Sequence, residues 1–78
     1  MKVRTLIRRI NPKTLVEIVD CDFNRLFYGY TPEITKEIWK VLVGLNVEEI
    51  NPFVAKTGVF SKELAMQIRL TEKLNKNS

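Results

Sequence analysis

Histidine is absent from this 78-residue chain, and cysteine occurs once. The chain therefore lacks the usual general base near neutral pH, the commonest metal ligand and the usual partner of a catalytic Ser or Cys. A single thiol, Cys21, cannot form an intramolecular disulfide or a thiolate metal site, which is typical of a protein of the reducing cytoplasm. These absences predict a cytoplasmic protein that is not an enzyme and uses no metal or other cofactor.

Glycine and long apolar runs are also scarce. The chain has three Gly residues and no Gly-rich loop ahead of a helix, so phosphate binding of the P-loop or dinucleotide kind is unsupported. Its N-terminus alternates basic and apolar residues without an uninterrupted apolar stretch, which predicts neither a signal peptide nor a membrane span. We therefore expect no membrane partner and a single small domain with one modest core.

Positive charge is concentrated at the start of the chain. The net charge is +4, and the first thirteen residues hold no acidic residue. A charge segregated onto one short element favours an anionic partner, either a protein or a nucleic acid. The bland alternative is a solvated face that only keeps the protein soluble. The candidate partner-binding residues are Lys2, Arg4, Arg8, Arg9 and Lys13.

Apolar spacing predicts two helices. Val3, Leu6, Ile7 and Ile10 recur on one stripe of an amphipathic helix that ends at Asn11-Pro12. Thr31-Pro32-Glu33 should begin the second helix, with a side-chain cap, a Pro in the first turn and an acid near the N-terminus. Its apolar stripe comprises Ile34, Ile38, Val41, Leu42 and Leu45, and Gly44 or Asn46 should end it. Trp39 lies off this stripe, and either packs at the edge of the core or serves as an interface anchor.

Four segments have strand character. Residues 14–20 and 25–29 should form a β-hairpin around the turn at residues 20–24. Residues 47–55 contain Pro52, which predicts either an edge strand or a strand that bends there, and such an edge could pair with its own copy in a homodimer. Residues 64–70 alternate with a period of two and are interpreted as a strand, although helix formers and Ser61 as a cap leave a helix open.

The expected fold is therefore a small α+β domain over residues 1–71. Its order is helix, strand, strand, helix, strand, strand, and two helices cover one face of a mostly antiparallel four-stranded sheet. Residues 72–78 should be a flexible C-terminal tail.

The acidic turn offers the only pattern that resembles a metal site. Asp20, Asp22 and Asn24 have the spacing that opens an EF-hand loop, but Arg25 and Thr31 stand where that loop needs Gly and Glu. Side-chain hydrogen bonds that hold the turn are the favoured interpretation. A carboxylate pair for acid–base chemistry is rejected, because an exposed turn would leave both groups solvated.

Aromatic residues on the second strand bear on nucleic-acid binding. Phe27, Tyr28 and Tyr30 could stack on bases while the basic helix follows a phosphate backbone. Phe27 and Tyr28 must however point to opposite faces of the sheet. No RNP-like or helix-turn-helix sequence is present, so this hypothesis depends on charge alone.

The first thirty residues or so carry a family resemblance. An amphipathic Val-Arg-Thr-Leu-Ile segment precedes a V-E-I-x-D strand, an acidic turn and an L-F-x-G strand. This pattern resembles small uncharacterised proteins of bacteriophages and mobile elements in low-GC Gram-positive bacteria. Such proteins are commonly acidic in the helix, whereas this chain is basic there. The residues that carry the resemblance are Asn11, Lys13, Thr14, Val16, Glu17, Ile18, Asp20, Asp22, Asn24, Leu26, Phe27 and Gly29.

The resemblance implies a phage or prophage origin inside a bacterial cytoplasm. Together with the basic helix, it leads to the hypothesis of a non-catalytic accessory protein that binds a cytoplasmic protein, for example as an inhibitor of a host or defence protein. The alternative function is nucleic-acid binding through the basic N-terminal helix.

Overall fold

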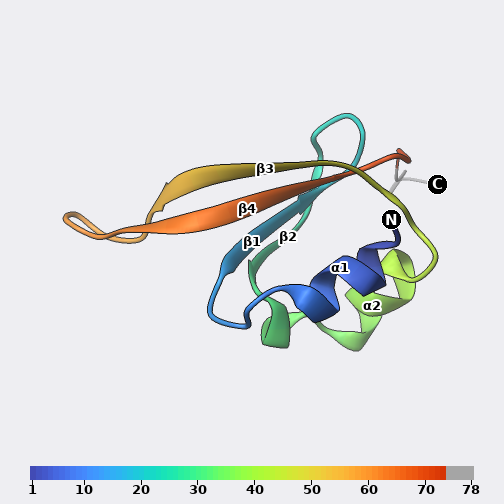
Figure 1. Cartoon of the computed structure of the whole chain (residues 1–78), viewed down its shortest axis with the longest axis horizontal. Coiled ribbons are helices and arrows are strands. Elements are labelled where there is room, and N and C mark those ends of the chain that lie inside the picture. Colours follow the sequence, from blue (N-terminus) through green and yellow to red (C-terminus); the bar gives the residue numbers. More distant parts are fainter. Residues whose placement is uncertain (74–78) are drawn as a thin grey trace.

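Within residues 1–73, which the computed structural model describes, four strands form one sheet and two helices pack on one of its faces (Figure 1). The predicted α+β class and the order of the elements are confirmed. The elements are α1 (Val3–Arg9), β1 (Leu15–Val19), β2 (Arg25–Tyr30), a 3₁₀ turn η1 (Thr31–Glu33), α2 (Lys36–Leu42), β3 (Val47–Lys56) and β4 (Lys62–Leu70).

The sheet is mixed: it is mostly antiparallel, as predicted, but its central pairing is parallel. The strand order is β2-β1-β4-β3, and β1 pairs with β4 in parallel. The two hairpins, β1–β2 and β3–β4, are antiparallel as expected. Turn residues determine how a hairpin closes, but they do not determine which of its strands meets the other hairpin. Here β4 inserts between β1 and β3, and its direction matches that of β1.

The core lies between the helices and the sheet. The predicted stripe of α1 is buried, with Val3 completely covered and Leu6 and Ile7 less than a tenth exposed. It packs on the sheet side chains that alternate toward the helices, including Val16 and Ile18 of β1. Ile68 and Leu70 of β4, Phe27 of β2, and Ile34 and Leu42 beside or within α2 complete this cluster.

The second helix begins four residues later than expected. Thr31–Glu33 form only a 3₁₀ turn, in which the Glu33 carboxylate accepts a hydrogen bond from the Tyr30 N–H at 2.8 Å. The helix starts after Thr35, whose hydroxyl oxygen accepts a hydrogen bond from the Ile38 N–H. Thr31 and Thr35 are both suitable N-cap residues, and the helix that packs on the sheet begins after Thr35. Val41 is exposed as a result, although it was expected on the buried stripe.

The end of the chain confirms two expectations and leaves one outside the described residues. Residues 62–70 form a strand and not a helix, and β3 is the edge strand that Pro52 predicted. Glu72 and Lys73 contact the β1–β2 turn through the Cys21 N–H and the Asp22 carboxylate. The rest of the predicted tail, residues 74–78, lies outside the described residues.

Pro52 closes the exposed edge of β3. The Thr57 N–H donates to the Ser61 carbonyl, so Thr57 faces β4. Because backbone groups alternate along an antiparallel ladder, the even-numbered residues of β3 direct their N–H and C=O groups away from β4. Pro52 is one of them, and its ring stands where an incoming strand would need an N–H donor. Homodimerisation by sheet extension is therefore disfavoured at this edge.

Replacing this proline should open the edge. A Pro52→Thr variant restores the missing donor and adds a β-branched residue, so we expect it to form larger species than the wild-type protein at the same concentration. Light scattering across a dilution series measures this. Ile50→Thr, which changes another exposed β3 residue outside the arm without adding a donor, is the control. Equal sizes for Pro52→Thr and wild type would show that the edge is closed by something else.

Candidate binding surface

The basic residues of α1 lie on the solvent side of the helix. Arg4, Arg8 and Arg9 are exposed while the apolar stripe of the same helix faces the sheet, and Lys13 is exposed in the loop that follows. None of the ion pairs found within residues 1–73 involves these four side chains. Arg8 and Arg9 suit the negative C-terminal end of the helix, whereas Arg4 near the N-terminal end opposes the helix dipole. Helix stability therefore does not explain the whole set.

Lys2 has a different environment from the other predicted residues. Its ammonium donates to the Gly44 carbonyl at 2.9 Å, and its backbone forms a bridge with Asn46. The Val3 N–H donates to Leu45 and the Met1 carbonyl accepts from Val47, so this segment ties the N-terminus to the end of α2. Gly44 supplies the positive φ, +90°, that the chain needs there. Lys2 thus fastens the two helices together, although its charge still adds to the surface.

The second helix extends the positive surface beyond the residues that the sequence predicted. Lys36 and Lys40 of α2 are exposed on the same side of the sheet as α1 (Figure 1). Against the seven cations of the two helical segments stand only Glu33 and Glu37. The charge pattern along the sequence did not predict these lysines, because residues 14–78 taken together are close to neutral. We call the exposed cations the cationic helix layer: Arg4, Arg8, Arg9, Lys13, Lys36 and Lys40.

The opposite face of the sheet has its charges paired. Arg25 contacts the Glu17 carboxylate at 2.8 Å, and the same carboxylate accepts a hydrogen bond from the Gln67 amide. Arg69 contacts Glu49 at 3.0 Å. Hydrogen bonds from Arg69 and then from Asn51 lower the pKa of Glu49 from its ordinary value. This face therefore neutralises itself, which the cationic helix layer does not do.

Neither Phe27 nor Tyr28 exposes its ring beside the free cations, whereas Tyr30 lines a pocket together with Lys13. Phe27 is buried toward the helices, as its alternation with Tyr28 required. Tyr28 lies on the open sheet face opposite Glu17, where the Arg25 guanidinium is 4.6 Å from its ring centroid. Tyr30 points the same way and donates a hydrogen bond to Glu63. A strand of nucleic acid stacked on Tyr28 would meet a paired carboxylate, with the unpaired cations of the helices on the other side of the sheet.

Trp39 packs at the edge of the core. It is half-buried and contacts the helix-side apolar cluster, together with Ile38 and Leu45. Of the two alternatives left open by its position off the stripe, packing at the core edge is the one that these contacts support.

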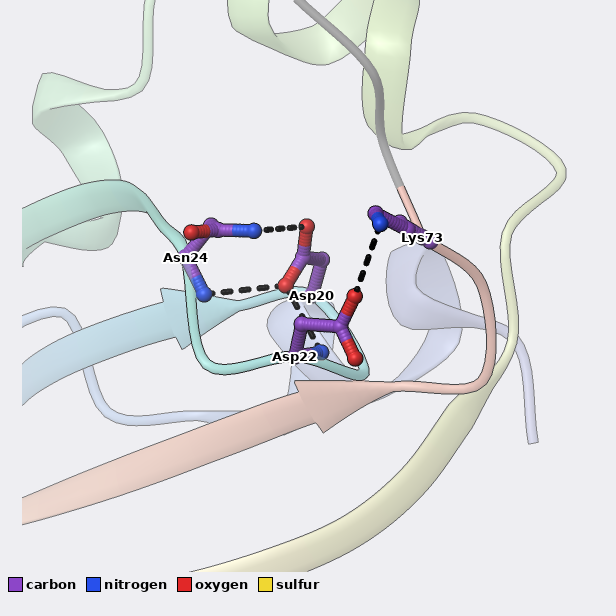
Figure 2. Close-up of polar contacts among 4 residues, drawn as sticks. All are labelled: Asp20, Asp22, Asn24 and Lys73. Carbon is purple, nitrogen blue, oxygen red and sulfur yellow. Dashed lines mark hydrogen bonds and ion pairs between the residues drawn. The ribbon is translucent and has the colours of Figure 1, made fainter.

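The acidic turn is held together by Asp20. Figure 2 shows one carboxylate oxygen of Asp20 accepting from the backbone N–H groups of Asp22 and Asn24, both at 2.9 Å, while the other accepts from the Asn24 amide. The favoured side-chain-bonded turn is thus confirmed. The expectation of an exposed Asp20 was wrong, because the residue is completely buried. Phe23 completes the turn with a positive φ of 65°, and Asp22 contacts Lys73 at 3.3 Å (Figure 2).

An open pocket of about 310 Å³ lies where the loop after α1 meets the end of β2. Pro12, Lys13 and Tyr30 line it. The Tyr30 hydroxyl donates to the Glu63 carboxylate at 2.5 Å. This hydrogen bond raises the pKa of Tyr30, and the nearby negative charge adds to the effect, because ionisation would break the bond and place two anions together. The pocket thus combines one free ammonium with a phenol that resists ionisation.

The raised pKa of Tyr30 predicts a loss of stability in alkali. A folded-state pKa above the unfolded value of 10.0 contributes stability that is complete below that value and is lost as the pH rises through the folded pKa. We expect Tyr30→Phe to unfold with a shallower dependence on pH above 10 than wild type, whereas Tyr28→Phe should follow wild type. Urea unfolding at a series of alkaline pH values measures this, and parallel curves for Tyr30→Phe and wild type would contradict it.

Comparison with protein-family models, with curated proteins and with solved structures finds no match to the chain. In residues 1–73 no group of three or more Cys, Asp or Glu side chains is arranged to hold a metal ion. The same residues include no helix long and apolar enough to cross a membrane. The function proposed below therefore rests on the charges and contacts of the surface.

Proposed function

We propose that this protein is a non-catalytic binding module whose cationic helix layer docks on an acidic surface of a protein partner. The observation that carries the proposal is the separation of charge between the two faces. Cations on the open sheet face are paired with carboxylates, whereas Arg4, Arg8 and Arg9 stand exposed without an ion pair among the described residues. Unpaired cations on a rigid, well-packed helix are suited to steer and orient an anionic partner.

A protein partner is favoured over nucleic acid by the position of the rings. Binding to single strands combines cations with aromatic stacking in one groove. Here Tyr28 lies on the face opposite the free cations and next to Glu17, and Tyr30, although it lines a pocket with Lys13, donates its hydroxyl to Glu63. The helix α1 is only seven residues long and its apolar side chains are buried, so few side chains are left to contact bases in a DNA groove.

The resemblance to phage and mobile-element proteins gives this binding activity an expected setting. A small phage protein without catalytic residues acts by occupying a surface of another protein. We therefore propose an accessory role in the bacterial cytoplasm, with inhibition of a host or defence protein as its expected form.

The test is differential capture from a nuclease-treated lysate of the source cell. Immobilised wild-type protein is compared with the triple variant Arg4→Glu/Arg8→Glu/Arg9→Glu and with Lys56→Glu/Lys62→Glu/Lys73→Glu, which changes the net charge equally at exposed lysines outside the helix layer. We expect one protein to be retained by wild type and by the lysine variant, and lost with the arginine variant.

The nucleic-acid alternative needs its own measurement. Fluorescence anisotropy with short single-stranded and duplex DNA and RNA should show no complex with the wild-type protein at physiological salt. A complex that persists there and disappears in the arginine variant would replace the protein partner by a nucleic acid.

A further inference from the structure

The hairpin formed by β3 and β4 projects beyond the rest of the molecule (Figure 1). Pairing between β1 and β4 begins at Leu15 and Ala65, so residues 62–64 and their partners 54–56 have no third strand beside them. We call residues 54–64 the arm. The arm helps to give the molecule dimensions of 40 × 24 × 22 Å. A two-stranded ribbon is marginally stable in water unless something covers it.

One face of the arm continues the apolar row of the core, but no helix packs on it there. Leu70, Ile68, Met66 and Leu64 alternate along β4 on the side that faces the helices. Leu70 and Ile68 are completely buried, Met66 is half-buried, and Leu64 is 77% exposed. The helix layer thus ends before the row of apolar side chains does.

The exposed apolar residues of the arm lie at the same end of the molecule. Val54 lies directly opposite Leu64 on the same face and is 58% exposed. At the tip, Val59 is 91% and Phe60 99% exposed. Four large apolar side chains gathered at one end of a small protein indicate an interaction site, since a soluble monomer rarely leaves them together in water. We call Val54, Val59, Phe60 and Leu64 the arm patch.

We propose that the arm patch is covered by the arm of a second copy of this chain, packed face to face and antiparallel about a two-fold axis near Val54 and Leu64. Pro52 closes the adjacent edge, so the contact uses side chains and not backbone pairing. Packed ribbons lie about 10 Å apart, which places each arm at the level of the partner's helices and brings each Phe60 toward the end of that layer. The proposal is independent of the function proposed for the cationic helix layer.

The charges of the arm are compatible with this arrangement. Lys56 and Lys62 lie opposite each other, one step along the same face beyond Val54 and Leu64. An axis at Val54 places each lysine pair over Pro52 and Met66 of the other copy. The two lysine pairs are then about 13 Å apart along the arms. Their repulsion is weak, because this distance exceeds the screening length of roughly 8 Å at physiological salt.

The area of the patch fits a modest dimer. Four side chains per copy expose several hundred Å², so two patches together bury on the order of 1,000 Å², near the lower bound for specific interfaces. The expected dissociation constant is therefore in the micromolar range.

Sedimentation equilibrium from about 1 µM to about 1 mM tests the proposal over the range where such a dimer dissociates. We expect a monomer–dimer transition in the wild-type protein. Phe60→Ser and Leu64→Ser, both at exposed positions that the fold does not need, should raise the dissociation constant about tenfold or more. Val41→Ser, at an exposed position on α2, should not change it. A monomer at all concentrations, or a dimer indifferent to both arm variants, overturns the proposal, and a monomer would leave the patch to a different protein.

A cross-link locates the axis. In a Cys21→Ser background, a short bis-maleimide reagent should join Val54→Cys into a covalent dimer, because the residue faces its own copy across a gap of about 10 Å at a two-fold axis. Val41→Cys in the same background should not be joined. A dimer in which Val54→Cys fails to cross-link contradicts the face-to-face arrangement.

Discussion

Replacement of Asp20 by Ala should lower the free energy of unfolding by about 3 kcal/mol, because it leaves two backbone N–H groups in the turn without their charged acceptor. Both groups donate to the same Asp20 oxygen, and the residue is completely buried. A domain of this length has a total stability of roughly 4 to 12 kcal/mol, so the loss is a large fraction of it. Urea unfolding followed by circular dichroism measures the effect.

Asp22→Ala is the matched control in the same turn. Within residues 1–73 its carboxylate forms an ion pair with Lys73, and both side chains are more than half exposed. An exposed ion pair of this kind contributes little, so the change should stay within about 0.5 kcal/mol. Similar losses for the two variants would show that the turn is not held by Asp20.

Reversing the charge of Arg4, Arg8 and Arg9 together should weaken binding to the captured protein by about 100-fold. Each reversal should cost about 1 kcal/mol at the rim of an interface, and the total of about 3 kcal/mol corresponds to that factor. The fold should survive, because all three side chains are exposed and form no ion pair within residues 1–73. Isothermal titration calorimetry with the purified partner measures the change.

The lysine triple variant separates position from net charge. It carries the same formal charge as the arginine variant, but its substitutions lie on the arm and after β4. Its affinity should stay within a few-fold of wild type. Equal weakening by both variants would mean that the partner responds to overall charge and not to the helix layer.

Local pattern was sufficient for much of the fold. The stripe of α1, the hairpin around Asp20 and the edge position signalled by Pro52 follow from periodicity and turn chemistry. The parallel pairing of β1 with β4 did not, because residues 15–19 and 65–69 are brought together only by the packing of the two hairpins. The start of α2 was misplaced because Thr31 and Thr35 are both acceptable caps, and tertiary packing selects the second.

The candidate surface was predicted in part. Arg4, Arg8, Arg9 and Lys13 lie exposed as the charge pattern indicated, whereas Lys2 is engaged with Gly44. Lys36 and Lys40 of α2 could be added to the surface only after the structure placed both helices on one face of the sheet. The arm patch had no signal in the sequence, since Val54 and Leu64 belong to rows that are buried elsewhere in the same strands. Only the register, which ends the β1 pairing at Ala65, shows that they are left uncovered.

The salt dependence of partner affinity tests the central claim most directly. If the cationic helix layer docks on an acidic surface, the affinity of the wild-type protein should fall about tenfold between low and physiological salt, and the residual binding of the arginine variant should change little. An affinity for the wild-type protein that stays constant across this range would contradict the claim, because it would show that the contact is made by apolar groups and not by these charges.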